Sequence, residues 1–444
     1  MLAKPLLRPC SRSRLFVYST LLKEAYSAAV SAADPLHCLK PEHLPLRPRG
    51  RTLVVGAGKA AASMAKAVER LWPRDAPLEG LVITRYAHGL PLTHLQCIEA
   101  GHPVPDEAGQ EAAQAIAQKV AQLTPNDQLL VLVSGGGSSL LALPAPGLTM
   151  DDLKGVTQQL LRSGAPIQEM NVVRKHLSRL QGGQLALMSK APVRTLVISD
   201  VVGDQSSDIA SGPCDPDPSS YEDARAVLAR WGVEPPTAVA KHLEAGCKGM
   251  IPETPKPGDP RLSHATTIML ATAKASLDAA CGVLQKQGFQ TLCLGDGVTG
   301  EARDVAGVMA SLVREIVDQR IPEFRRPLAV VSGGECTVTV RGSGHGGRCT
   351  EFLLAHGLAL EALGVEPCVW GLAADTDGID GSSDAAGAYS APDFLNRARA
   401  QGLDPRRCLD NNDALSLFRG LGTHLRTGPT RTNVNDIRIL LVVA

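Results

Sequence analysis

Two glycine-rich loops contain residues that could bind an anionic ligand. The first, Gly56-Ala-Gly58-Lys59-Ala-Ala61, has the spacing G-x-G-x-x-A, and the second is Ser134-Gly135-Gly136-Gly137-Ser138. Backbone N–H groups in such turns and at helix starts bind phosphates and carboxylates. Lys59 strengthens this interpretation, because a cation at a helix start opposes the helix dipole unless an anion is bound there. The alternatives are a tight packing turn for the first loop and a flexible connector for the second.

A third glycine-rich segment ends in an arginine. Ser332-Gly333-Gly334-Glu335 is followed by Gly342-Ser-Gly-His-Gly-Gly-Arg348, which we predict to open a helix. Arg348 could bridge two phosphate oxygens with its forked guanidinium group. The segment therefore indicates another anion site, with a hairpin turn as the alternative.

Acidic residues follow two of the apolar runs. Asp200 comes after Val193–Ser199, and Asp375 and Asp377 come after Val369–Ala374. Carboxylates at the end of a strand suit a hard divalent cation or a general base. We therefore expect metal binding or substrate orientation here, with a turn-forming role as the alternative for Asp200.

Two further segments add polar groups. Asn171-Val-Val-Arg-Lys175-His-Leu-Ser178 places two cations beside a histidine, and its spacing alone favours a solvated helical face. Asn433 lies in a loop, Thr427–Asp436, that supplies hydroxyls, amides and a carboxylate before the last strand. Cations, glycine loops and acidic loops together are typical of phosphoryl transfer, in which positioning and charge neutralisation provide most of the catalysis.

The rival interpretation is an oxidoreductase that binds a dinucleotide at the G-x-G-x-x-A loop. An NAD site has an acidic residue after the second strand, whereas this chain has Thr84-Arg85 there. Arg85 could accept the 2′-phosphate of NADP, so this interpretation stays open. The additional anion loops exceed what hydride transfer needs.

The elements that must position these residues are alternating strands and helices. Apolar runs at Thr52–Val55, Leu81–Thr84, Leu129–Val133 and Val193–Ser199 predict strands, and residues 107–123 have helical spacing. The alternation predicts an α/β fold with a mostly parallel sheet and chemistry at the strands' carboxyl ends. The Pro-rich stretch 251–260 predicts the boundary between a domain of residues 1–250, a linker of residues 251–263 and a domain of residues 264–444.

Composition limits the function classes. The 444 residues include 45 Lys and Arg and 45 Asp and Glu, and this balance argues against a nucleic-acid-binding surface. The 11 cysteines form no C-x-x-C pair and fit the reduced thiols of a cytoplasmic protein. No apolar run approaches the roughly 18–20 residues that a membrane span needs. Residues 1–23 carry five basic and no acidic residues, which is typical of a transit peptide, but we favour the frayed N-terminus of a cytoplasmic enzyme.

The motifs as a set resemble the class II glycerate 2-kinases, a family with a MOFRL-type C-terminal domain whose members also carry the name hydroxypyruvate reductase. The matching segments include those above together with Gly101–Asp106, Ser199–Asp204, Ile209–Pro213 and Thr376–Gly381, and the resemblance covers about residues 25–440. It implies a two-domain α/β fold, with a Rossmann-like αβα N-terminal domain and a smaller α/β C-terminal domain. It also implies transfer of the γ-phosphoryl group of ATP to the 2-hydroxyl of D-glycerate with Mg²⁺. NAD(P)H-dependent hydroxypyruvate reduction is the alternative.

The resemblance also implies roles for individual residues. Lys59 and Arg348 are the expected catalytic cations, while Asp200, Asp375 and Asp377 hold Mg²⁺ or orient the hydroxyl; we group Asp200 with the catalytic residues and the other two with the metal. The expected substrate- and nucleotide-binding residues are Gly56, Gly58, Ser134, Gly135, Gly136, Gly137, Ser138, Lys175, Ser332, Gly333, Gly334, Glu335 and Asn433.

The chain departs from the family pattern at two places. Cys349-Thr350 stands where many relatives have Asn-Gln, and Arg431 stands where many have Gly. The first could alter local hydrogen bonding, and the second adds a cation that could shift substrate preference. The expected partners are the small molecules glycerate and ATP, without nucleic acid or membrane, and assembly into a homo-oligomer stays open.

Overall fold

The computed structural model describes residues 12–365 and 368–443. The chain forms two compact units, which we treat separately. Unit 1 contains the described residues up to 32, residues 273–430 and those from 435 onward, and unit 2 contains residues 33–272 and 431–434. The chain is thus a two-domain α/β protein in which unit 2 is the larger domain.

A fully parallel six-stranded sheet forms the centre of unit 2. Its strands are β1 (Thr52–Ala57), β2 (Leu78–Arg85), β3 (Gln96–Ala100), β4 (Gln128–Val133), β5 (Val193–Ile198) and β6 (Ala265–Ala271). Their order is β3-β2-β1-β4-β5-β6, which is the order of doubly wound sheets. The strand order reverses between β1 and β4, and ligands bind at such a switch point in open α/β sheets.

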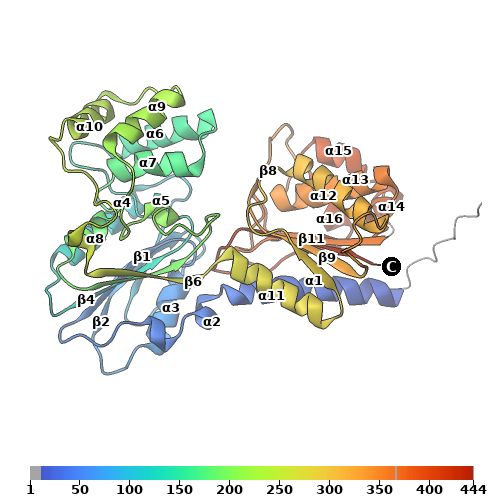
Figure 1. Ribbon diagram of the computed structural model, residues 1–444, viewed down its shortest axis with the longest axis horizontal. Helices are drawn as coiled ribbons and strands as arrows, with labels where there is room; N and C mark the ends of the chain where they lie inside the picture. The colour runs from blue at the N-terminus through green and yellow to red at the C-terminus, as the bar shows by residue number, and fades with distance from the viewer. Residues whose placement is uncertain (1–11, 366–367, 444) are drawn as a thin grey trace, which may run out of the picture. The chain divides into compact units, whose positions relative to one another are not determined.

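Helices cover both faces of this sheet, which explains why β1 and β4 are buried along their whole length. Helices α4 (Glu107–Ala121) and α8 (Gln184–Met188) contribute to the core on one face, and α3 (Ala61–Leu71) lies on the other (Figure 1). The amphipathic spacing of α4 places Ala112, Ile116 and Val120 in that core. The short helix α5 (Gly137–Leu140) lies on the same face as α4, and the short helix α2 (Pro35–Cys38) packs against α3.

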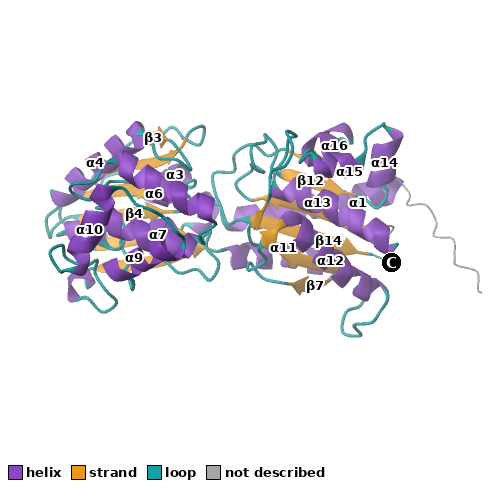
Figure 2. Ribbon diagram, turned by 90° about the horizontal axis from the view of Figure 1, so that it is seen from above, coloured by secondary structure: helices purple, strands orange, loops and turns teal. Residues whose placement is uncertain are grey.

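Four helices of unit 2 form a separate group with its own apolar core. They are α6 (Met150–Ser163), α7 (Ile167–Leu177), α9 (Tyr221–Arg230) and α10 (Thr237–Cys247). Figure 2 shows them gathered in front of the sheet. Leu160 of α6, Val173 of α7 and Leu228 of α9 share one hydrophobic cluster, so the group packs as a unit.

Unit 1 is built on a mixed six-stranded sheet in the order β13-β12-β11-β14-β9-β7. The strands are β7 (Gln290–Cys293), β9 (Leu328–Ser332), β11 (Val369–Asp375), β12 (Gly387–Ser390), β13 (His424–Leu425) and β14 (Asp436–Val442). Strands β7 and β9 are parallel and the other pairs are antiparallel. The expected mostly parallel sheet is therefore found in unit 2 and not in unit 1, because β14 lies between β9 and β11 and runs against both. A small parallel pair joins β8 (Gly300–Glu301) to β10 (Cys336–Thr337).

The two faces of this sheet pack against different helices. Along β14, Ile439 and Leu441 face α1 (Arg12–Ala32) and α11 (Ala273–Lys286), whereas Leu440 and Val442 face α12 (Ala302–Val317) and α13 (Arg348–Leu363). The period of two follows from the pleat of a strand. The short helices α14 (Phe394–Ala400), α15 (Pro405–Asp410) and α16 (Ala414–Gly420) join the second layer, and Figure 1 shows both layers.

The division of the chain differs from the sequence-based expectation in two respects. Strand β6 pairs with β5, so unit 2 extends to residue 272 and the Pro-rich stretch lies inside it. Asp217 N donates to Pro255 O, and Thr254 Oγ1 donates to Asp217 Oδ2, so this stretch is packed rather than a free linker. Helix α1 belongs to unit 1 because Leu22, Ala25 and Tyr26 are buried in its core.

Helix α1 also bears on the expected frayed N-terminus. Residues 12–32 are helical, while residues 1–11 of that expectation lie outside the described residues. Among the helices of the described ranges, none is long and apolar enough to span a lipid bilayer.

Candidate functional site

The turn between β1 and α3 uses its amide groups inside unit 2. Three successive amides donate to acceptors of the unit: Gly58 N to Ile83 O at 3.1 Å, Lys59 N to Gly135 O at 2.8 Å and Ala60 N to Ser134 Oγ at 3.0 Å. A Cβ atom on Gly58 would overlap Ser134, so glycine is required for the two loops to approach. The anion cradle expected at Gly56 and Gly58 is therefore not formed by these amides, and the packing-turn alternative describes the loop.

The loop after β4 has a packed part and an available part. Ser134 is buried and accepts from Ala60, and Gly137 packs against Ala210. By contrast, the N–H groups of Gly135–Gly136 have no acceptor among the described residues. Ser134 and Gly137 are thus structural, whereas the Gly135–Gly136 turn offers two amides to a ligand.

Four side chains surround this turn, and we call Lys59, His102, Asp200 and Asn433 the lysine cluster. A Cβ atom on Gly135 would overlap the Asp200 carboxylate, and one on Gly136 would lie 2.8 Å from His102 Nε2 and 3.5 Å from Lys59 Cγ. Asn433 Nδ2 donates to Asp200 Oδ2 at 3.1 Å. Only glycine leaves room at both positions, so the turn brings a cation, a carboxylate, an amide and an imidazole together.

The topology of the parallel sheet explains how these residues meet. Lys59 follows β1, the glycine turn follows β4 and Asp200 follows β5, and the carboxyl ends of parallel strands share one edge. His102 follows β3 at the same edge and is a residue that the sequence reasoning did not select. Its signal was available, because Gly101-His102-Pro103 comes directly after a strand.

Lys175 and His176 do not form the solvated helical face that their spacing favours. The Lys175 side chain is 3% exposed, and its ammonium lies 3.4 Å from Asp208 Oδ1 and 3.5 Å from Asp217 Oδ1. Burial alone would raise the pKa of Asp217, but Lys175, Ser219 and His176 together lower it. Lys175 is therefore enclosed by carboxylates, which differs from the expected contact with a nucleotide.

Unit 1 holds a second charged group, which we call the arginine cluster: Arg348, Glu335, Asp375 and Asp436. Arg348 donates to one carboxylate from each of its three guanidinium nitrogens: Nε to Asp436 Oδ1 at 2.8 Å, Nη1 to Glu335 Oε1 at 2.5 Å and Nη2 to Asp375 Oδ2 at 2.6 Å. Burial would lower the pKa of Arg348, but the three carboxylates raise it above its ordinary value. The guanidinium is therefore a fixed positive charge, oriented on three sides.

The antiparallel register places the members of the arginine cluster. Asp375 at the end of β11 is directly opposite Asp436 at the start of β14, and β9 ends beside them. In the expected ligand loop Ser332–Glu335, Gly333 N donates to Gly295 O and Gly333 O accepts from Arg438, whereas the buried Ser332 Oγ has no hydrogen-bond partner among the described residues. Of that loop, Glu335 alone reaches Arg348.

Comparison with known proteins assigns the chain to a family. Residues 21–244 match a domain of unknown function (DUF4147), and residues 328–436 match the MOFRL family. A D-glycerate 2-kinase of Thermotoga maritima is 38% identical over 95% of this chain and 97% of its own length. The chain belongs to the class II glycerate 2-kinase family. A crystal structure of a glycerate kinase from Thermotoga maritima matches 96% of this chain and all of its own, with 37% identity and a TM-score of 0.84. An Agrobacterium vitis protein provisionally named hydroxypyruvate reductase is 46% identical over 95% of this chain and 94% of its own.

The departure at Cys349-Thr350 lies where α13 begins, and one of its side chains, Thr350, joins the local hydrogen bonds. Cys349 N and Thr350 N, at the start of α13, donate to the two oxygens of Asp380 at 2.9 Å each, and Thr350 Oγ1 donates to Asp380 Oδ2 at 2.7 Å. Burial is the main reason that the pKa of Asp380 is raised, to about 6. The start of α13 is thus capped by a carboxylate of the chain itself, so the N–H groups of Cys349 and Thr350 are not available to the anion expected at Gly342–Arg348.

The aspartates after β11 do not form a metal site of protein ligands alone. In the parts of the chain that the structure describes, no three His, Cys, Asp or Glu side chains are arranged to hold a metal ion. Asp375 accepts from Arg348 and from Asp377 N, and Asp377 Oδ1 accepts from Ile379 N. Mg²⁺ is usually bound through one or two carboxylates plus phosphates and waters, so two aspartates fit a metal that arrives with a nucleotide.

Proposed function

We propose that the protein transfers the γ-phosphoryl group of ATP to the 2-hydroxyl of D-glycerate, giving ADP and 2-phosphoglycerate. The observation that carries this proposal is the lysine cluster at the switch point of the parallel sheet. There a cation and a carboxylate flank a glycine turn whose two amides have no acceptor among the described residues. Family membership supports the same reaction, because relatives that span nearly the whole chain are named glycerate kinases.

The residues of the lysine cluster suit the parts of this reaction. Asp200 accepts the proton of the 2-hydroxyl as its oxygen attacks the γ-phosphorus, and the bond to the β–γ bridging oxygen breaks to release ADP. Lys59 and the amides of Gly135–Gly136 stabilise the charge of the transferring phosphoryl group. Asn433 orients the Asp200 carboxylate through its amide. His102 lies beside Gly136, where it could donate to a phosphate oxygen.

Arg348 supplies a second cation in this proposal. Its three carboxylate partners fix the guanidinium direction, so little side-chain entropy is lost when it binds an anion. Mg²⁺ is proposed to accompany ATP, with Asp375 and Asp377 as its candidate carboxylates. When bound, the metal neutralises phosphate charge.

Reduction of hydroxypyruvate with NAD(P)H has weaker support. In dinucleotide-binding folds, the turn after the first strand presents its amides to the pyrophosphate, whereas here those amides donate to Ile83, Gly135 and Ser134. The proposed location is the cytoplasm, which agrees with the free thiols of the cysteines that the structure describes.

The test is ADP release with D-glycerate and Mg²⁺ by the parent protein and two lysine variants. Lys59→Met should lower kcat by about 10²–10³-fold, as loss of one preorganised donor does. Lys66→Met, on the partly exposed face of the helix that follows this turn, is the matched control and should keep parental activity. Equal activity of the two variants would refute the role of Lys59, and absence of D-glycerate-dependent ADP release by the parent would refute the proposed reaction.

A further inference from the structure

Unit 2 contains a pocket beside the lysine cluster. Of the site residues expected from the sequence, Ser138 alone lines this pocket. Apolar side chains of α6 and α7, including Leu160 and Val173, form one wall, and Pro103 and Pro105 form another. Ser138 and Ser139 line its polar side, directly after the Gly135–Gly136 turn. The loop after β4 carries both the Gly135–Gly136 turn and Ser138, and the loop after β3 carries both His102 and Pro103. The pocket and the lysine cluster are therefore bordered by the same two loops.

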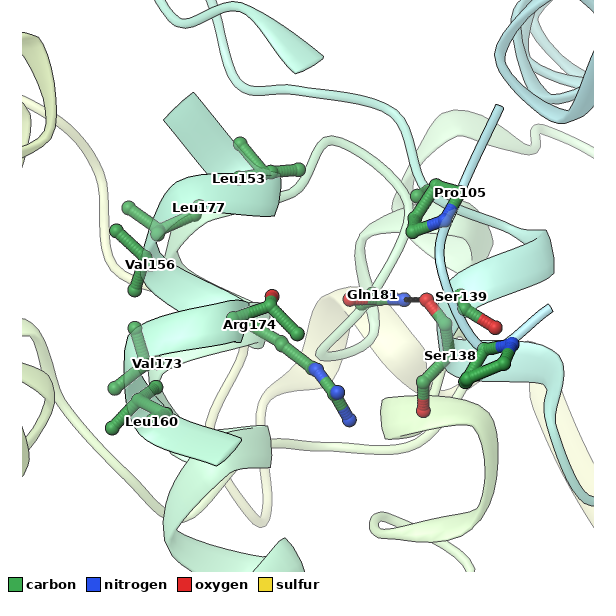
Figure 3. A pocket seen from close by; sticks show the side chains of 13 residues that line it. Pro105, Ser138, Ser139, Leu153, Val156, Leu160, Val173, Arg174, Leu177 and Gln181 are labelled. Atoms are coloured by element: carbon green, nitrogen blue, oxygen red, sulfur yellow. Dashed lines mark hydrogen bonds between the residues drawn. The ribbon is translucent and has the colours of Figure 1, made fainter. Parts of the chain in front are cut away.

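Arg174 is the one charged residue among those that line this pocket. Figure 3 shows its side chain extending from α7 toward Ser138. Its guanidinium has a single polar contact in the described structure, from Nη1 to the neutral Asn171 Oδ1 at 3.3 Å. Burial lowers the pKa of Arg174 to about 10. The neighbouring Lys175, in contrast, is paired with two carboxylates.

A partly buried cation without a carboxylate partner is costly unless a ligand supplies the opposite charge. Other hydrogen bonds hold the surrounding groups in place. Ser211 Oγ donates to Asn171 Oδ1 at 3.0 Å and pairs with Ser138 Oγ at 2.9 Å, while Gln181 Nε2 donates to Ser138 O at 2.8 Å. The network ties α7 to the loop after β4, so the pocket and its cation are preorganised.

We infer that Arg174 binds the carboxylate of the acid that accepts the phosphoryl group. One planar guanidinium matches one carboxylate through two parallel hydrogen bonds, whereas a triphosphate carries more charge than one arginine offsets. Carboxylate and 2-hydroxyl sit on adjacent carbons of a 2-hydroxy acid. A carboxylate bound to Arg174 in the pocket therefore holds the 2-hydroxyl close to the pocket, next to the loop that carries the Gly135–Gly136 turn. This inference rests on the proposed function and makes Arg174 a specificity-determining residue.

The experiment compares Arg174→Met with Arg162→Met, an exposed arginine on the adjacent helix α6. Binding of D-glycerate without nucleotide is measured by titration calorimetry, and KM values for D-glycerate and ATP by ADP release. Loss of a charge-assisted pair should weaken D-glycerate binding about 10- to 100-fold in Arg174→Met and leave the KM for ATP within twofold. Arg162→Met should resemble the parent in both.

Discrimination between D-glycerate and uncharged glycerol gives a readout that a purely structural role would not move. The ratio of the two kcat/KM values should fall by the same factor in Arg174→Met, and Arg174→Lys should restore part of it because it keeps the charge. A parental Kd for D-glycerate in folded Arg174→Met, or equal loss for glycerate and glycerol, would overturn the inference.

The inference and the proposed function fail separately. If the parent phosphorylates D-glycerate and Arg174→Met has an unchanged KM for it, the function stands and the inference falls. If the parent phosphorylates nothing, the function falls, and binding of D-glycerate or lactate to the parent, but not to Arg174→Met, still supports the carboxylate pocket. Circular dichroism and thermal unfolding of Arg174→Met and Arg174→Lys establish that each variant is folded.

Discussion

Replacement of Arg348 by methionine tests the arginine cluster, because methionine keeps a long side chain and removes the charge. The carboxylates of Asp375 and Asp436 are 4% and 0% exposed, so both would stay buried without Arg348, and Asp436 would keep only its second cation, Arg438, at 3.1 Å. Breaking a buried ion pair costs about 3–5 kcal/mol. For a domain of 150–250 residues, each kcal/mol of lost unfolding free energy lowers Tm by about 2–4 °C. The Tm of unit 1 should therefore fall by about 6–20 °C. Loss of a transition-state cation should also lower kcat by about 10³-fold or more.

The stability and the catalytic effects are separated by a second variant and a control. Arg348→Lys keeps the charge but cannot donate in three fixed directions, so it should lose less stability than Arg348→Met while kcat stays strongly reduced. Arg399→Met removes an exposed arginine of unit 1 that pairs with Glu361. An exposed pair contributes less than about 1 kcal/mol, so this control should keep parental kcat and nearly parental Tm.

The assays are thermal unfolding by circular dichroism and ADP release at 25 °C, where all variants are expected to be folded. A kcat for Arg348→Met within twofold of the parent would refute the catalytic role of Arg348. An unchanged Tm would refute the reasoning that the two buried aspartates depend on this arginine.

Three other predictions follow from buried groups and close contacts. Burial lowers the pKa of His356 to about 3, so below pH 6.5 the unfolded chain takes up a proton that the native protein does not. The parent should therefore lose up to about 1.4 kcal/mol of unfolding free energy per pH unit as the pH falls from 6 to 4, and His356→Leu should lack this loss. Urea titrations at several pH values measure it, and parallel plots of unfolding free energy against pH for parent and variant would contradict the prediction. Gly135→Ala should lower kcat/KM at least tenfold because the added Cβ would overlap Asp200. The control Gly155→Ala adds a Cβ in open space on α6 and should raise the free energy of unfolding by about 1 kcal/mol with parental activity. Equal activities of the two variants would count against the lysine cluster. Lys175→Met should lower Tm with an unchanged KM for ATP, and a raised KM without a loss of stability would instead identify a nucleotide ligand.

Elements whose pattern reports burial were predictable from the sequence. The run Leu129–Val133 is apolar at every position because β4 is covered on both faces, and it is a strand of the parallel sheet. Strand direction in unit 1 was not predictable in this way. Periodicity identifies β14 but does not report that it lies between β9 and β11 and runs against both. The Pro-rich stretch indicates irregular chain, and only its contacts with Asp217 show that it is packed inside unit 2.

The candidate site was predictable in composition more than in detail. Glycine serves both close loop packing and ligand approach, and the sequence does not distinguish Gly58, which faces Ser134, from Gly135, which faces Asp200. The sequence likewise does not distinguish the surroundings of the adjacent cations Arg174 and Lys175. Lys175 points into a carboxylate pair while Arg174, one residue earlier, lines the pocket, since neighbouring positions on a helix face different surroundings.

Identification of the phosphorylated carbon distinguishes 2-phosphorylation of D-glycerate from every alternative reaction considered above. The protein is incubated with D-glycerate, ATP and Mg²⁺, and the product is analysed by phosphorus–proton correlation NMR, with hydroxypyruvate and NADPH in a parallel reaction. We expect one phosphate ester on carbon 2, with stoichiometric ADP and no oxidation of NADPH. Phosphate on carbon 3, or NADPH oxidation without any phosphorylated product, would contradict it.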